Sequence, residues 1–427
     1  MIIHQDICIL GAGPGGLTTA IDLAQKGIPS LVVDKAIFPR HKADGDAMTS
    51  NVLRTLFELS PDMYHRLTQR TDIVKSINGF CFSAPNGKSV SFSLASPVNK
   101  ALEIEDCFGC KRIDFDQFLL DEAKKEPLIQ ILENCALHDF ERTSEGGIIL
   151  YDKTRSVEIH AKLLIIASGS NSRFTRILGG FSHHPKEMAI GLRAYYKNVK
   201  GLQAGRTHCV LYKSILPGGI CINPMADGTA SISVVMRSYE IKKNKLNPQK
   251  ELLEAIQKQP FLKRAFKDAE LVGEIAGTSL HLGVSDRKIA GNNFIIIGDA
   301  AGLADPISAN GIGHAMITGR MAASKAAECL QKNDFSEITT GSFSAQVALR
   351  LKKSLRIGRL AFLLFGLPPS IILFAANMLA SFLKNETLNE LMFSTNVTKT
   401  LISPKFYWRL IFSKNVPSSY SKEVIKP

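Results

Sequence analysis

The sequence lacks the features of a secreted, cross-linked or disordered protein. The first expected strand begins at about Asp6, which leaves no room ahead of it for a secretory leader. The eight cysteines are scattered over 427 residues and suggest no disulfide framework. The content of 45% hydrophobic and 21% charged residues argues against disorder and fibrous classes. We therefore expect a cytoplasmic globular protein with two or three folding units.

Evidence for a metal site is also scarce. Cys107-Phe-Gly-Cys110 is a CxxC pair, which alone fits a redox site or half of a zinc site. No second pair and no nearby histidine cluster completes a zinc site. We expect a structural role for these cysteines and no bound metal.

Positive charge is concentrated near the C-terminus. From Gly341 onward the chain has 12 Lys and Arg against 3 Glu and no Asp, so +9 of the formal net charge of +13 lies there. The remainder is close to neutral, and we expect no nucleic-acid partner.

This basic region contains a run of 24 uncharged residues, Leu360 to Leu383. Gly366-Leu-Pro-Pro369 divides the run into segments of roughly 8 and 14 residues, too short to cross about 30 Å of hydrocarbon as straight helices. A monotopic anchor on an anionic membrane surface, a buried lid or dimer face, and a true span are the alternatives. We favour the first, which would make the protein peripheral on the inner face of the membrane.

A glycine-rich motif near the N-terminus predicts a dinucleotide-binding turn. The apolar run at residues 7–10 precedes Gly11-Ala-Gly13-Pro14-Gly-Gly16, and a helical apolar pattern follows. Gly11 permits the turn, Gly13 lets the backbone approach a pyrophosphate, and Gly16 allows close packing of helix and strand. A second apolar run ends at Asp34, about 20 residues later, where a carboxylate that binds ribose is expected.

A second motif lies far along the chain. The apolar run at residues 294–297 leads to Gly298-Asp299, and a helical pattern begins near Gly311. Ligands of open α/β sheets bind where strands end, so Asp299 is a candidate ligand residue.

Together these motifs resemble those of the FAD-dependent superfamily of geranylgeranyl reductases, flavin aromatic hydroxylases and flavin halogenases. The resemblance implies that Asp299 holds the ribityl chain and that the helix starting at Gly311 and Ile312 faces the flavin O2 edge. Phe38-Pro-Arg40 and Arg112 also resemble segments of the reductase branch that contact FAD. The implied cofactor-binding residues are Gly11, Gly13, Pro14, Gly16, Asp34, Lys35, Arg40, Arg112, Leu137, Gly169, Asp299, Gly311 and Ile312.

The same resemblance implies an α/β fold of the para-hydroxybenzoate hydroxylase type. A Rossmann-like FAD-binding domain would comprise residues 1–75, 106–180 and 271–335. A β-rich substrate domain would be inserted as residues 76–105 and 181–270. Residues 336–427 would form a basic, apolar helical region.

Several positions depart from the family pattern. Ser168, just before Gly169, stands where hydroxylases usually have an aspartate that is linked to flavin and nicotinamide binding. The sequence shows no second dinucleotide fingerprint, so reducing equivalents would come from transiently docked NAD(P)H or from a partner reductase. Ile220, Ile222 and Asn223 replace aromatic residues that line the reductase cavity. The single tryptophan, Trp408, leaves the halogenase WxWxIP pattern missing and makes halogenation unfavoured.

The segment after Arg40 reads Asp44-Gly45-Asp46 in place of the Cys-Gly-Glu of the reductase branch. Asp44 or Asp46 could orient a substrate hydroxyl or serve as a base. Alternatively, Asp44 caps a helix that begins at about Ala47.

We therefore expect an FAD-dependent oxidoreductase that acts on a hydrophobic organic or lipid-like substrate. The favoured reaction is NAD(P)H-dependent hydroxylation through a flavin hydroperoxide. Saturation of isoprenoid or polyene double bonds is the alternative. A flavin-binding redox sensor or assembly factor without turnover is the alternative from another class.

Overall fold

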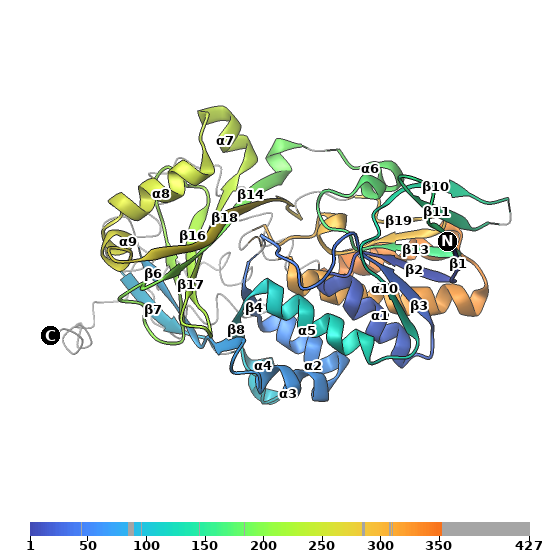
Figure 1. Cartoon of the computed structure of the whole chain (residues 1–427), viewed down its shortest axis with the longest axis horizontal. Helices are drawn as coiled ribbons and strands as arrows, with labels where there is room; N and C mark the ends of the chain where they lie inside the picture. The colour runs from blue at the N-terminus through green and yellow to red at the C-terminus, as the bar shows by residue number, and fades with distance from the viewer. Residues whose placement is uncertain are drawn as a thin grey trace, which may run out of the picture.

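The computed structural model describes residues 1–43, 45–83, 89–94, 96–144, 146–182, 184–283, 287–306, 309 and 311–351. They form two lobes side by side, each built on its own large sheet (Figure 1). One lobe carries helices on the main parallel sheet, and the other is a twisted antiparallel-rich sheet with helices on its outer side.

The first lobe is organised by a six-stranded sheet of order β19-β20-β13-β2-β3-β9, in which all neighbours except β19 and β20 are parallel. Its inner strands are short apolar runs because helices cover the sheet. The strands are β2 Ile7–Leu10, β3 Ser30–Val33, β9 Ile129–Leu132, β13 Leu163–Ile166, β19 Ala290–Gly291 and β20 Phe294–Ile296.

The helices of this lobe pack closely where glycines allow it. A Cβ atom added at Gly15 would lie 3.0 Å from the Ala315 carbonyl oxygen, and one added at Gly319 would lie 2.5 Å from the Gly15 oxygen. Gly15 belongs to α1 and the other two residues to α10, so these two helices touch through their backbones. The helices of the lobe are α1 Pro14–Gln25, α2 Ser50–Leu59, α3 Pro61–Thr68, α4 Pro97–Ala101, α5 Arg112–Lys124, α6 Arg173–Gly179, α10 Ile312–Lys332 and α11 Glu337–Thr340.

Two smaller sheets complete the first lobe. The four-stranded sheet has the order β1-β12-β11-β10, and the three-stranded sheet has the order β4-β8-β5. Their strands are β1 Ile2–His4, β4 Ala47–Thr49, β5 Val74–Ser76, β8 Cys107–Cys110, β10 Leu137–Arg142, β11 Ile148–Asp152 and β12 Glu158–Ala161. The helix expected from about Ala47 is wrong by three residues, because residues 47–49 pair with β8 and α2 begins at Ser50.

The second lobe is a seven-stranded sheet of order β18-β14-β17-β16-β15-β6-β7. Its strands are β6 Gly79–Ser83, β7 Ser89–Ser93, β14 Met188–Lys197, β15 Arg206–Val210, β16 Gly219–Pro224, β17 Ala230–Arg237 and β18 Glu270–His281. Helices α7 Ser238–Asn244, α8 Pro248–Lys258 and α9 Pro260–Ala265 lie on its outer side (Figure 1). Because β18 pairs with β14 as far as His281, this sheet continues past the expected domain boundary at residue 270.

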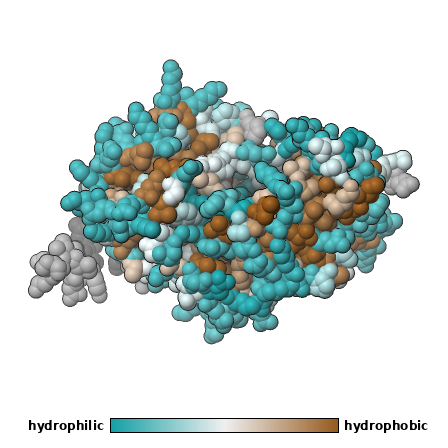
Figure 2. All heavy atoms as spheres, in the orientation of Figure 1, coloured by the Kyte–Doolittle hydropathy of each residue, from teal (hydrophilic) through white to brown (hydrophobic). Residues whose placement is uncertain are grey.

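Hydrophilic residues cover most of the face drawn in Figure 2, with hydrophobic patches between them on both lobes. Within the described ranges, no helix combines the length and the apolar character needed to cross a bilayer. The uncharged run Leu360 to Leu383 lies outside those ranges. Peripheral membrane association therefore stays a prediction.

Candidate functional site

The two sequence motifs meet at one edge of the six-stranded sheet. Strands β2, β3, β13 and β20 run parallel, so their carboxyl ends lie together. The residues that follow these strands are Gly11, Asp34, the segment 167–169 and Gly298-Asp299. Elements separated by almost 300 residues in the sequence thus form one edge, where ligands of open α/β sheets bind.

The glycine turn has no space for side chains at two of its positions. Gly11 has a φ of +112°, and a Cβ there would lie 2.6 Å from the Ala167 carbonyl oxygen. A Cβ at Gly16 would lie 1.9 Å from the Gly11 oxygen. Glycine is therefore required at both positions to seat α1 against β2 and β13.

The N-terminus of α1 is suited to an anion. Gly13 precedes the helix, no side chain caps it, and its first turn contains no acidic residue. Arg40 brings a guanidinium to this point, since its Nη2 lies 3.8 Å from the position that a Cβ would take at Gly13. Backbone N–H groups, the helix dipole and a cation therefore converge where a pyrophosphate would bind.

Asp34 closes the other side of the glycine turn. Its carboxylate accepts hydrogen bonds from the backbone N–H groups of Ala12 at 2.8 Å and Ala36 at 2.9 Å. The segment that leads into β10 runs beside it, because the Cys135 N–H donates to the Asp34 carbonyl oxygen at 2.9 Å. This contact brings Leu137, the first residue of β10, into the same neighbourhood, whereas Lys35 is exposed.

A buried carboxylate that was not expected from the sequence links the two predicted arginines. Asp116 accepts a bidentate pair from Arg112, with both N–O distances at 2.9 Å, and lies 3.2 Å from Arg40 Nη1. Arg112 and Asp116 are both essentially inaccessible to solvent. Their spacing of four residues, which places both on one helix face, was the available signal in the sequence.

The second motif packs against the start of α10. Gly298 adopts a φ of +59°, and a Cβ there would lie 2.7 Å from Ala315 Cβ. The next residue, Asp299, is the second residue of the 3₁₀ turn Gly298–Ala301. It lies so close to Gly311 that a Cβ on Gly311 would be 2.0 Å from its Oδ1. Gly311 precedes α10 and provides no side-chain cap, so a second helix N-terminus opens at this edge.

Gly169, the remaining predicted residue of this edge, follows β13 with a φ of +80° and has open space beside it. Ser168 lies against the glycine turn, because its Cα would be 3.0 Å from a Cβ at Gly11. The hydroxyl of Ser170 donates to the Ser279 carbonyl oxygen of β18 at 2.5 Å. The segment after β13 thereby joins the two lobes next to the candidate site.

These residues fit FAD. The uncapped start of α1, with Arg40, would hold the pyrophosphate, and Asp34 would hold the adenosine ribose. Asp299 and the start of α10 would hold the ribityl chain and the flavin edge. When bound, FAD supplies the redox chemistry, and the chain supplies binding, orientation and electrostatics.

Asp46, expected as a catalytic candidate, instead joins the two lobes. From the first lobe, the backbone N–H of Arg112 donates to its Oδ1 at 3.1 Å. From the second lobe, Arg193 Nη1 and the Tyr195 hydroxyl donate to Oδ1, each at 3.0 Å, and the Ser231 hydroxyl donates to Oδ2 at 2.7 Å. The carboxylate is 1% exposed. Since donors from both lobes already occupy it, a structural role is favoured over that of a general base. The other candidate, Asp44, lies outside the described residues.

Tyr195 and the CxxC cysteines are held in their neutral forms. Burial, with Asp46 close by, raises the pKa of the Tyr195 hydroxyl. Burial also raises the pKa of Cys107 to about 12 and raises the pKa of Cys110. Both cysteines are inside β8, which agrees with the expected structural role.

The substrate side differs from the expectation at β16. Ile220 and Ile222 are fully buried in the core between the sheet and helices α8 and α9, so they do not line a cavity toward the first lobe. Asn223 points to the other side, where its Oδ1 accepts from the Thr207 hydroxyl at 2.6 Å. Successive side chains of a strand point to opposite faces of the sheet, so only every second residue of this segment can face the first lobe.

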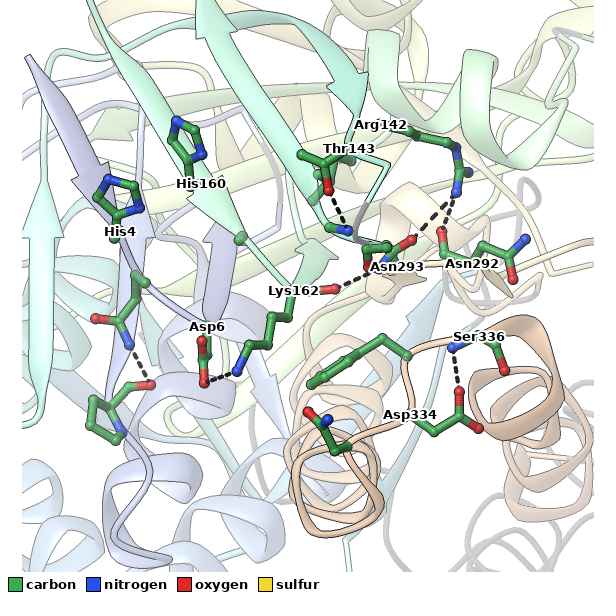
Figure 3. Close-up of a pocket in the computed structure, with 18 residues that line it drawn as sticks. His4, Asp6, Arg142, Thr143, His160, Lys162, Asn292, Asn293, Asp334 and Ser336 are labelled. Atoms are coloured by element: carbon green, nitrogen blue, oxygen red, sulfur yellow. Dashed lines mark hydrogen bonds and ion pairs between the residues drawn. The ribbon is translucent and has the colours of Figure 1, made fainter.

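A pocket of about 1190 Å³ lies at the opposite edge of the six-stranded sheet (Figure 3). Asp6, Lys162 and Asn293, the residues directly before β2, β13 and β20, line it. Asp6 and Lys162 pair at 3.1 Å, and Asn293 donates to the Lys162 carbonyl oxygen at 2.9 Å. None of the predicted cofactor residues lines this pocket, which is at the amino ends of the strands.

Comparison with known proteins agrees with this architecture. The family model described as FAD binding domain matches residues 4–338. The chain is 24% identical over 369 residues to a 1H-pyrrole-2-carbonyl peptidyl-carrier-protein chlorinase of Pseudomonas fluorescens, covering 81% of each chain. It is 26% identical over 352 residues to digeranylgeranylglycerophospholipid reductase 1 of Methanothermobacter thermautotrophicus, covering 80% of this chain and 82% of the relative.

Among solved structures, a geranylgeranyl bacteriochlorophyll reductase-like protein of Thermoplasma acidophilum has the same fold. The TM-score is 0.76 with 19% sequence identity, and the match covers 94% of this chain and 99% of the other. The expected fold class is thus confirmed. The chain belongs to the FAD binding domain family and is an FAD-dependent oxidoreductase of the superfamily that includes geranylgeranyl reductases, flavin hydroxylases and flavin halogenases.

Proposed function

We propose that this enzyme is an NAD(P)H-dependent monooxygenase that hydroxylates an organic substrate with a hydrophobic body and at least one polar group. The observation that supports this proposal is the polarity of the sheet surface that faces the first lobe. The first lobe supplies the FAD site, so this surface is the candidate roof of the substrate cavity.

Strand register identifies the residues on that surface. Ala194, Ile232 and Ile220 belong to the apolar core beneath α8 and α9, so their sequence neighbours face the other way. Cross-strand pairing places those neighbours in rows with one another. The polar residues of the surface are Arg193, Tyr195, Cys209, Cys221, Asn223, Ser231 and Ser233, and the same register adds Ala189, Gly191 and Val235 at one end.

Such a surface suits a substrate that can return hydrogen bonds. Its hydrogen-bonding groups have partners inside the protein, since Arg193, Tyr195 and Ser231 bond to Asp46 and Asn223 bonds to Thr207. An isoprenoid chain laid on this polar surface would bury little apolar area against it, whereas a phenol, carboxylic acid or amide attached to an apolar body could combine apolar contact with further hydrogen bonds. The network around Asp46 would keep the surface in place while the substrate is bound.

The route of reduction belongs to the same proposal. Within the described residues, the glycine turn at residues 11–16 is the single strand-turn-helix dinucleotide fingerprint that we identify. NAD(P)H would therefore dock transiently near Ser168 and the start of α10. A partner reductase is the alternative source of electrons.

Reduction of isoprenoid or polyene double bonds is the second candidate function. It is favoured by the match to the reductase-like protein over almost the whole length of both chains. The polar sheet surface and the replacement of Cys-Gly-Glu by residues 44–46 count against it. Halogenation is not proposed, since the single tryptophan is Trp408.

Oxygen labelling separates the two candidates. The full chain with FAD is incubated with NADH or NADPH under ¹⁸O₂, with a panel of aromatic acids, phenols, amides and polyprenyl lipids. We expect a product that carries one ¹⁸O atom from the polar members of the panel. A polyprenyl product that gains two hydrogens and no label would overturn the proposal in favour of the reductase.

A further inference from the structure

Two cysteines of the second lobe lie directly opposite each other on neighbouring strands. Cys209 of β15 pairs with Cys221 of β16 in an antiparallel ladder. Their sulfur atoms are 3.3 Å apart. Although all eight cysteines lie in the described part of the chain, this is the one pair with a sulfur-to-sulfur contact.

The position of the pair makes it accessible from the substrate side. The sheet residues on either side of the pair, Val210, Ile220 and Ile222, belong to the core under α8 and α9, so both thiols point toward the first lobe. Cys221 is half-buried, whereas Cys209, at 8% exposed, and the other six cysteines are buried. Ser233 stands opposite Cys221 on β17, which gives the pair a polar neighbour.

The two thiols are chemically unequal. Their hydrogen bond lowers the pKa of Cys221 and, together with burial, raises the pKa of Cys209. Cys221 is thus the sulfur that more readily becomes a thiolate, and it is also the more exposed of the two. A thiolate is the nucleophile in reactions with peroxides and disulfides.

We propose that Cys209 and Cys221 are a redox-active pair that a hydroperoxide converts to a reversible cross-strand disulfide. The Cys221 thiolate attacks one oxygen of the peroxide, which breaks the O–O bond, forms a sulfenic acid and releases hydroxide or alkoxide. The Cys209 sulfur then attacks the Cys221 sulfur, and the sulfenic oxygen leaves as water. The two thiols are oxidised by two electrons, the peroxide is reduced, and a dithiol reverses the step by exchange.

The geometry requires little movement. Directly opposed residues of an antiparallel pair have Cα atoms about 4.5–5.5 Å apart, inside the range of about 4.4–6.8 Å for disulfides. The sulfur atoms need to approach by roughly 1.3 Å to reach a bond length near 2.05 Å, which side-chain rotation can supply. The bond would connect two strands of the surface that we assign to the substrate, but the proposal does not depend on which reaction the enzyme catalyses.

Peptide mapping tests this pairing. The full chain with FAD is treated with hydrogen peroxide, denatured in N-ethylmaleimide, digested and analysed by mass spectrometry. We expect a linked peptide pair about 2 Da lighter than the sum of its two thiol peptides, which dithiothreitol removes. The Cys107 and Cys110 peptides, buried in β8, serve as internal controls and stay alkylated.

Two variants assign the roles. Cys209→Ser should leave Cys221 as a sulfenic acid that dimedone traps, and Cys221→Ser should leave Cys209 alkylated. Alkylation of both thiols in the oxidised wild-type protein, to the same extent as Cys107, would overturn the proposal. So would a linkage of either residue to another cysteine. If a variant loses its fold, the wild-type map still decides.

Discussion

Asp116 lies 3.2 Å from Arg40 while it accepts two side-chain hydrogen bonds from Arg112. Arg40 belongs to the segment after β3, and the other two residues belong to α5. One buried carboxylate therefore sets the position of the cation that lies beside the first helix N-terminus. In this account Asp116 is a positioning residue for FAD binding.

Replacing Asp116 by Asn should destabilise the protein strongly. The change removes the carboxylate charge that pairs with the buried Arg112, and breaking a buried ion pair costs about 3–5 kcal/mol. Urea unfolding followed by circular dichroism measures the loss. Asp72→Asn, which removes an exposed partner of Arg70, is the matched control and should have no measurable effect. Equal stability of both variants would contradict the assigned role.

Replacing Gly311 by Ala should reduce the bound FAD. The new Cβ would lie 2.0 Å from Asp299 Oδ1, so Asp299 or the start of α10 must move. FAD stoichiometry is read from the absorbance ratio of the purified protein and from titration of the apoprotein. Gly219→Ala is the control, because no atom lies within 4 Å of its added Cβ. Full FAD occupancy in Gly311→Ala would show that the flavin does not depend on this contact.

Asp46→Asn separates a structural role from a catalytic one. Loss of the charge facing Arg193 in this buried network should lower stability by about 3–5 kcal/mol. If NAD(P)H is the reductant, as we propose, its rate of oxidation per bound FAD should change little. A variant with wild-type stability and FAD content but a rate at least about a hundredfold lower would indicate a general base instead.

The buried His208 should make the stability of the second lobe sensitive to acidic pH. Burial lowers its pKa to about 4 from 6.5, the ring stacks on Phe261 at 5.2 Å, and its Nε2 accepts from the Gln203 N–H. Between pH 6.5 and pH 4, His208 is protonated in the unfolded chain and neutral in the folded chain. The neutral, buried His208 therefore contributes fully to the free energy of unfolding above pH 6.5, and this contribution is lost as the pH falls toward 4.

His208→Gln keeps an acceptor and removes the titration. The free energy of unfolding of the wild type should therefore fall more steeply between pH 6.5 and pH 4 than that of the variant. Parallel curves for the two proteins would contradict the assigned cause.

Features set by local sequence could be predicted, and features set by distant contacts could not. The glycine turn was predictable because Gly11 and Gly16 have local packing reasons in one strand-turn-helix unit. The role of Asp46 was not, since its partners Arg193 and Ser231 lie 147 and 185 residues away. Ile220 and Ile222 were wrongly assigned to the cavity side of the sheet. Their side depends on which face of the sheet the helices cover, and the alternation of residues along the strand does not reveal that face.

An experimental structure of the full chain with bound FAD would show whether the cofactor lies where these residues converge. We expect the pyrophosphate at the start of α1, within hydrogen-bonding distance of the backbone after Gly13 and beside Arg40. We also expect the ribityl chain at Asp299 and the flavin at Gly311. FAD bound elsewhere, for example in the pocket between Asp6, Lys162 and Asn293, would contradict this placement.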